Sequence, residues 1–169
     1  MRQLRAAGAP CLPPPMSMLA ALLLCLHLLA ATWWVGGMAV MHFAVRPAAA
    51  QLLEPPLRLP FMAAVLRRFF AGVSAAVAVL LASGLGLIAL HGGFGQMHWS
   101  VHTMLAIGLL MTGVYAHVRL GLYPRLQQAI AARAWPAAAA QLNAIRQRVA
   151  LNLALGTLVY VLAIAGRGF

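Results

Sequence analysis

Four long apolar segments constrain the fold of this chain more than any other feature. They cover approximately residues 18–45, 69–90, 101–122 and 149–165. As a helix, each is long enough to cross the roughly 30 Å hydrocarbon layer of a bilayer. A segment in lipid must satisfy its own backbone hydrogen bonds, which only helices and closed barrels achieve. Because short connections join the four segments, we predict an all-α polytopic membrane protein, a four-transmembrane-helix bundle of up-down-up-down topology.

The composition agrees with this class of protein. Hydrophobic residues make up 64% of the 169 residues and charged residues only 8%, which a soluble domain of this length does not show. Residues 1–17 carry two arginines and three consecutive prolines, and we expect a disordered leader or a start site placed too far upstream. The apolar run that follows is too long for a signal-peptide core, so we expect the first helix to be retained. Residues 166–169 are expected to form a short tail.

The distribution of basic residues predicts the orientation. All 12 basic residues are arginines, and Glu54 is the single acid, which gives a net charge of +11. Nine arginines lie in or beside loops 46–68 and 123–148, three lie in the tails, and none lies in loop 91–98. Positive loops stay on the cytoplasmic side. We therefore predict a bacterial inner-membrane protein with both termini and loop 91–98 in the periplasm. The same rule accounts for the charge, so we expect no nucleic-acid partner.

Prolines and small residues predict the loops and the packing faces. The first loop is expected to be broken up by Pro47, Pro55, Pro56 and Pro60. Residues 125–133 are expected to extend the third helix, and residues 137–148 to start a new helix that runs into the fourth span. Two stripes at four-residue spacing are expected to face neighbouring helices: Ser74, Ala78, Ala82 and Gly86 in the second segment, and Asn152, Gly156 and Tyr160 in the fourth.

Two pairs of histidines lie in the first and third segments at the same spacing. His27 and His42 are 15 residues apart, and so are His102 and His117. Within each pair, the rise of a helix gives a separation of roughly 22 Å. Because the two segments cross the bilayer in the same direction, His27 is expected to meet His102 near one face, and His42 to meet His117 near the other. An ionisable side chain inside lipid is costly and indicates a functional site.

The first hypothesis for these histidines is copper binding. Imidazole and thioether ligands suit Cu(I). An outer cluster of such side chains would combine the loop with the starts of the two spans: His91, Met97, His98, His102 and His27.

The second hypothesis is b-type haem, held by one imidazole from each of two helices at His27/His102 and at His42/His117. Two stacked haems would carry electrons across the membrane. On a helical wheel, Trp34 and Met38 lie on one inward stripe with His27 and His42. Gly113 lies on the same side of its helix as His102 and His117. Gly36, Gly37 and Gly113 would make room for the macrocycle. A periplasmic metal or electron donor would then be a partner beside the bilayer.

A structural membrane subunit without a cofactor is the third alternative. The chain has no Ser/His/Asp constellation and no phosphate loop, and a single carboxylate excludes paired-acid chemistry. We therefore do not expect an enzyme, and a redox-active form would be an electron-transfer cytochrome.

Short motifs give the chain a family resemblance. In residues 26–37, LHLLAATWWVGG, a histidine is followed by Trp-x-Gly-Gly, and Arg46-Pro47 and Arg67-Arg68-Phe69 come later. This pattern resembles the CopD family of bacterial copper-resistance membrane proteins over roughly residues 19–165. The resemblance implies an inner-membrane protein linked to copper uptake or tolerance. Copper-linked transport is therefore the leading expectation, and haem-based electron transfer the alternative.

A second, weaker similarity concerns the third segment. Trp99-Ser100-Val101-His102 is similar to the third-helix opening of HemJ-type membrane protoporphyrinogen oxidases. That group carries a lysine shortly after this histidine, where Thr103 and Met104 stand here. The difference argues against porphyrinogen oxidation and leaves haem binding by His27 and His102 open.

Overall fold

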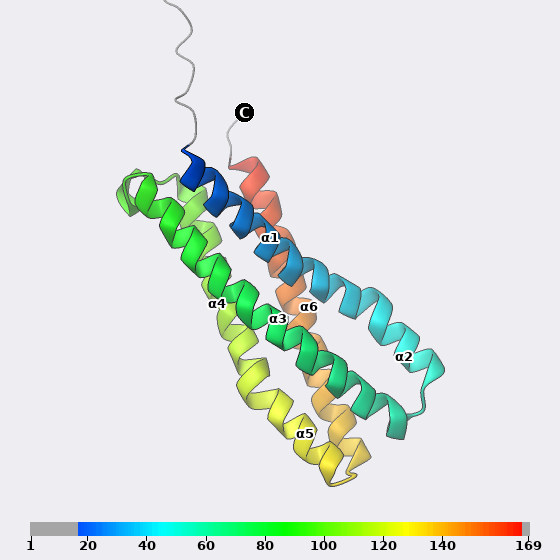
Figure 1. The fold of residues 1–169 in the computed structure, drawn as a ribbon. Helices are drawn as coiled ribbons and strands as arrows, with labels where there is room; N and C mark the ends of the chain where they lie inside the picture. Colours follow the sequence, from blue (N-terminus) through cyan, green and yellow to red (C-terminus); the bar gives the residue numbers. More distant parts are fainter. Residues whose placement is uncertain (1–16, 167–169) are drawn as a thin grey trace, which may run out of the picture.

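The computed structural model describes residues 17–166, so all of the predicted leader except Ser17 and all of the predicted tail except Gly166 lie outside the described residues. Within this range the chain is helical and has no strand. Figure 1 shows the elements in order: α1 (Met18–Val40), η1 (Met41–Val45), α2 (Arg46–Leu52), α3 (Pro55–Leu90), η2 (Phe94–Gln96), α4 (Trp99–His117), η3 (Val118–Leu122), α5 (Tyr123–Ala131) and α6 (Trp135–Ala165). η1 and η3 are π-helical turns, and η2 is a 3-10 turn.

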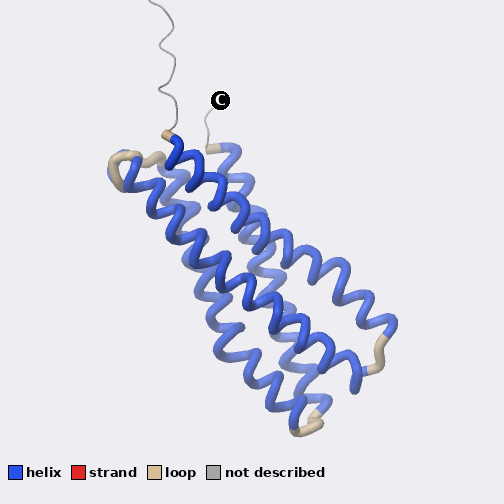
Figure 2. Tube along the Cα trace, in the orientation of Figure 1, coloured by secondary structure: helices blue, strands red, loops and turns tan. Residues whose placement is uncertain are grey.

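These elements join into four continuous helices, each long and apolar enough to cross a membrane: Met18–Leu52, Pro55–Leu90, Trp99–Ala131 and Trp135–Ala165. The four alternate in direction, and short loops join them (Figure 2). α1 packs mainly against α3 and α4 mainly against α6, while α6 also touches α1 and α3. The predicted all-α, four-helix membrane bundle is confirmed.

The two ends of the bundle differ in chemistry. The terminal end holds the start of α1, the end of α6 and the loop 91–98 (Figure 1). The arginine end holds residues 46–68 and 119–148, with all nine arginines of the described range: Arg46, Arg58, Arg67, Arg68, Arg119, Arg125, Arg133, Arg146 and Arg148. Helices of 31 to 36 residues are about 45 to 55 Å long. They therefore exceed the hydrocarbon layer, and we expect the arginine end to project beyond it.

The prediction that prolines break up residues 46–68 is wrong, because only Leu53 and Glu54 lie outside a helix. Pro55 and Pro56 occupy the first turn of α3, where a missing N–H costs no hydrogen bond. Pro47 follows the π-helical turn η1. In a regular α-helix a proline ring clashes with the carbonyl group four residues earlier, and the wider π turn moves that carbonyl away. Pro124 follows η3 in the same way. The predicted extension of the third helix is confirmed as α5, and α6 starts at Trp135, two residues before the predicted start.

The larger core lies at the arginine end. On α3, Leu59, Met62, Leu66 and Phe70 are buried at helical spacing. They pack with the buried Tyr123 and Leu126 and with other residues of η3, α5 and α6: Val118, Leu122, Ala138 and Ile145. The second core lies between the arginine end and the terminal end, in the part of the bundle that we call the membrane half. It surrounds Trp34, Met38, Val73, Val77 and Met111. Outside lipid the hydrophobic effect favours burial of apolar surface, whereas in the membrane half apolar side chains remain exposed toward lipid.

The two predicted packing stripes have different outcomes. On α6 the prediction is confirmed: Asn152 is buried and donates from Nδ2 to the carbonyl oxygen of Met111 at 3.0 Å. A Cβ built on Gly156 would lie 2.7 Å from a methyl group of Val35, so only glycine allows α6 to approach α1 this closely. On α3 the prediction is wrong for Ala78 and Ala82, which are exposed. It holds for Gly86, where a built Cβ would lie 3.1 Å from Leu23 of α1, and for Ser74, whose hydroxyl lies 2.7 Å from that of Tyr115 on α4. The packed face of α3 instead contains Val73, Ala76, Val77 and Ser83.

Candidate functional site

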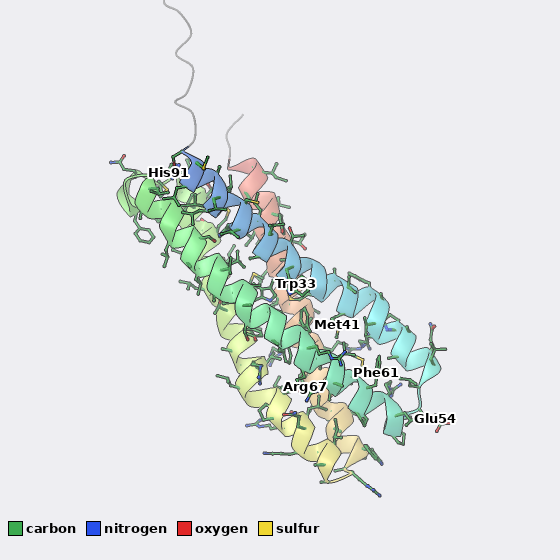
Figure 3. All side chains as sticks on the ribbon, in the orientation of Figure 1. Trp33, Met41, Glu54, Phe61, Arg67 and His91 are labelled. Atoms are coloured by element: carbon green, nitrogen blue, oxygen red, sulfur yellow. The ribbon has the colours of Figure 1, made fainter. Side chains whose placement is uncertain are left out.

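His91 lies exposed at the C-terminal end of α3, at the terminal end of the bundle (Figure 3). Its Nδ1 is 2.7 Å from the carbonyl oxygen of Leu87, one helical turn earlier. A carbonyl only accepts, so Nδ1 must carry the proton that is donated. In a neutral imidazole the other nitrogen, Nε2, then keeps its lone pair. His91 can therefore offer Nε2 to a metal ion.

His102 has the same arrangement in the second turn of α4. Its side chain is exposed, and Nδ1 lies 3.3 Å from the carbonyl oxygen of His98. Its ring centroid lies 6.2 Å from that of Phe94 in the loop. The Nε2 lone pair of His102 is again the free one.

His27 is seated between α1 and α3. The imidazole is half-buried, and its Nδ1 lies 3.0 Å from the hydroxyl oxygen of Ser83. Ser83 is buried and donates its own proton to the carbonyl oxygen of Val79 at 2.6 Å. The hydroxyl oxygen must then accept from Nδ1–H, which leaves Nε2 of His27 unprotonated. Sequence reasoning missed Ser83 because it assigned the packing face of α3 to the stripe of Ser74, Ala78, Ala82 and Gly86, which does not include Ser83.

Gly84 completes the seat of His27. A Cβ built at this position would lie 3.2 Å from Cε1 of His27. A larger residue would therefore press on the imidazole ring. Ser83 and Gly84 are thus two adjacent small residues that accommodate the imidazole of His27. The sequence alone does not identify His27 as their partner, because this depends on the register between α1 and α3.

His98 has a different role from the other histidines at this end. It is the N-cap of α4, where its Nδ1 accepts from the backbone N–H of Ser100 at 3.4 Å and lies 2.9 Å from the Ser100 hydroxyl. A side-chain acceptor at this position satisfies one of the free N–H groups of the first turn. Met97, the preceding residue, is half-buried. His98 therefore differs from His91, His102 and His27. Its Nδ1 accepts a hydrogen bond and caps α4, whereas Nδ1 of the other three is protonated and donates.

In the part of the chain that the structure describes, no hydrogen bond or ring contact joins the two histidines of either predicted pair. His27 is bonded to α3, whereas His102 is bonded within its own helix, and α1 and α4 pack mainly against other helices. His42 lies in η1 with its ring 4.9 Å from that of Phe43, and His117 is exposed at the end of α4. Within residues 17–166, no group of three or more His, Cys, Asp or Glu side chains is arranged to hold a metal. A shared site for either pair stays a prediction.

The inward stripe predicted for the first helix is confirmed, but the one for the third is wrong. Trp34 and Met38 are buried, and their histidine neighbours are half-buried. On α4 the buried side chains are Ser100 and Met111, while His102, Gly113 and His117 are exposed. The histidine side of α4 therefore faces away from the bundle.

The bundle interior around Gly37 does not fit a haem. A Cβ built on Gly37 would lie 2.7 Å from the ring of Phe69, so that side chain already fills the space expected for a macrocycle. Between Trp34, Tyr115 and Asn152 the remaining cavity has a volume of about 10 Å³. This is about the room that one water needs. This part of the bundle interior therefore has no room for a macrocycle.

Comparison with known proteins gives one match. The family model described as CopD, copper resistance protein D, matches residues 63–165, which is more than half of the chain. This range starts within α3 and runs to the end of α6, so it includes His91, His98, His102 and His117 and leaves out His27 and His42. No curated protein and no solved structure matches the chain.

Proposed function

Because the chain belongs to the CopD family of copper resistance membrane proteins, we propose that it binds copper at its terminal end and transfers it into or across the membrane. Copper is the cargo in this proposal. The proposal retains the leading prediction from the sequence, copper-linked transport, and adds that copper would bind at the terminal end.

The state of the imidazoles is the observation that carries the proposal. In His91, His102 and His27, Nδ1 donates to a protein oxygen, which fixes the ring orientation and leaves the Nε2 lone pair free. Histidines that bind metals commonly have this arrangement, in which a second-shell acceptor holds the other N–H. Neutral imidazoles with a free lone pair are ligands that Cu(I) accepts, and the thioether of Met97 would add a soft ligand.

The proposed roles follow the positions of the side chains. His91 and Met97 lie in or beside the loop and would take up copper from the aqueous face. His102, at the start of α4, would receive it next, and the half-buried His27 would hold it at the membrane boundary. His98 is a supporting residue, because its Nδ1 caps α4.

The charge distribution supports entry at this end. Among the described residues, the membrane half and the terminal end contain no arginine, since all nine lie at the arginine end. A cation at the terminal end is therefore far from the main source of repulsion. The arginine count predicts that this end faces the periplasm, and copper would then be taken from that side.

Copper binding by the purified full chain tests the proposal. We would titrate the protein in detergent with Cu(I) against a coloured Cu(I) chelator, for the wild type and for His27→Ala, His102→Ala and His117→Ala. We expect His27→Ala and His102→Ala each to bind less copper than the wild type and His117→Ala to retain it, because His117 lies exposed near the arginine end. Equal losses in all three variants, or no copper bound by the wild type, would contradict the proposal.

An absorption spectrum of the same preparation tests the haem alternative. The proposal expects no Soret band, because the interior around Gly37 is filled by Phe69. A Soret band that disappears in His102→Ala would instead favour the cytochrome.

A further inference from the structure

A cleft opens at the arginine end between α2, α3 and α6. Its volume is about 210 Å³, many times the roughly 10–15 Å³ that a single water requires. Polar side chains from three separate segments line it: Arg46 and His42, Arg58, and Arg146 with Asn143. The cleft therefore gathers three guanidinium groups that are far apart in the sequence.

The floor of the cleft is apolar and well ordered by packing. Leu59, Met62 and Ile145 contribute to it, and all three are buried members of the larger core. The backbone positions of Arg58 and Arg146 are thus fixed by their neighbours on α3 and α6. A cluster held in this way does not need a ligand to bring its helices together.

No acidic side chain of the described range 17–166 lines the cleft to balance its positive charge. Arg46, Arg58 and Arg146 line the same cleft, so three like charges share one space. Glu54, the single acid of the chain, is exposed in the loop between α2 and α3 and does not line the cleft (Figure 3). Like charges gathered around one cavity favour an anion there.

We propose that this cleft binds a phosphate-bearing anion, either the headgroup phosphate of a membrane lipid or free phosphate. Guanidinium groups match phosphate oxygens with two parallel hydrogen bonds each. The cleft lies where the predicted spans end: Arg46 directly follows the first and Arg146 precedes the fourth by three residues. Basic pockets between helices at the cytoplasmic boundary are positions at which anionic headgroups bind. This site is separate from the copper ligands, which lie at the other end.

Binding to the purified full chain in detergent tests the proposal. One arm measures inorganic phosphate by its effect on the thermal midpoint at constant ionic strength. The other measures a fluorescent phosphatidylglycerol against the same label on phosphatidylcholine. We expect Arg146→Gln and Arg46→Gln each to weaken binding about tenfold, equal to about 1.4 kcal/mol. The matched control is Arg125→Gln, which removes the same charge from an exposed position outside the cleft.

The outcomes separate the two sources. A response only to phosphatidylglycerol identifies the lipid headgroup, and a response to inorganic phosphate identifies the free anion; each supports the site if Arg125→Gln leaves it unchanged. A similar loss in Arg125→Gln would show unspecific attraction to the arginine end and would overturn the proposal. So would the absence of binding in both arms. Circular dichroism of each variant establishes that it is folded, and the two cleft variants serve as independent tests.

Discussion

Two leucines on α3 test whether the arginine end is a packed helical structure rather than the broken loop that its prolines suggest. Leu59 is 1% exposed and Leu57 is 66% exposed, although only two positions separate them. Replacing leucine by alanine removes three carbon atoms, so at about 0.8 kcal/mol for each buried group Leu59→Ala should cost about 2.4 kcal/mol. Leu57, with a third of its surface buried, should lose less than about 1 kcal/mol by the same rule.

Two further terms are small here. Leu59 lines the open cleft, so its truncation enlarges an existing space and adds little of the usual penalty for a closed cavity. Alanine favours the helix at least as well as leucine, so the backbone preference does not disturb the comparison. We therefore expect a difference between the two variants of more than about 1 kcal/mol.

Guanidinium unfolding of the full chain in a mild detergent, followed by far-UV circular dichroism, measures this difference. The midpoint should fall clearly for Leu59→Ala and barely for Leu57→Ala, with similar slopes for both. Equal losses in the two variants, or none in either, would show that residues 55–68 have no packed face. Such a result would refute a packed core at the arginine end.

Three further predictions follow from single contacts. Gly156→Val should lower the thermal midpoint in detergent, because the new side chain meets α1, whereas Gly113→Val, with nothing within 4 Å, should not. Asn152→Ala should destabilise the chain by about 0.6 to 1.7 kcal/mol in equilibrium unfolding, the usual range for a hydrogen bond between membrane helices; a larger loss would point to a different role. His98→Ala should reduce stability by about 1 kcal/mol through loss of the cap yet retain Cu(I) in the chelator titration, unlike His102→Ala.

The number and direction of the helices could be predicted from the sequence because they depend on apolar length. The positions of loops could not be predicted from prolines alone. Pro47 and Pro124 each follow a π-helical turn, which a local pattern does not reveal. The loop between α2 and α3 consists of only Leu53 and Glu54. It is this short because Pro55 and Pro56 suit the first turn of a helix.

The candidate site was only partly predictable for a similar reason. On α1 the aromatic and sulfur-containing side chains Trp34 and Met38 marked the packed face correctly. α4 is apolar on nearly all sides, so its sequence does not show which side packs. The structure packs Met111 inward and leaves His102 exposed. The seat of His27 depends on Ser83, 56 residues away, and only the register between α1 and α3 reveals it.

The two π-helical turns have a consequence for how the bundle tolerates insertions and deletions. A π turn contains one surplus residue, so η1 and η3 each shift the phase of the following helix relative to the preceding one. Deleting one residue from Met41–Val45 would rotate α2 by about 100° against α1. Ala49 would then leave the core while Trp34 kept its place. The surplus residue therefore lets the helix before the π turn and the helix after it face their own cores independently.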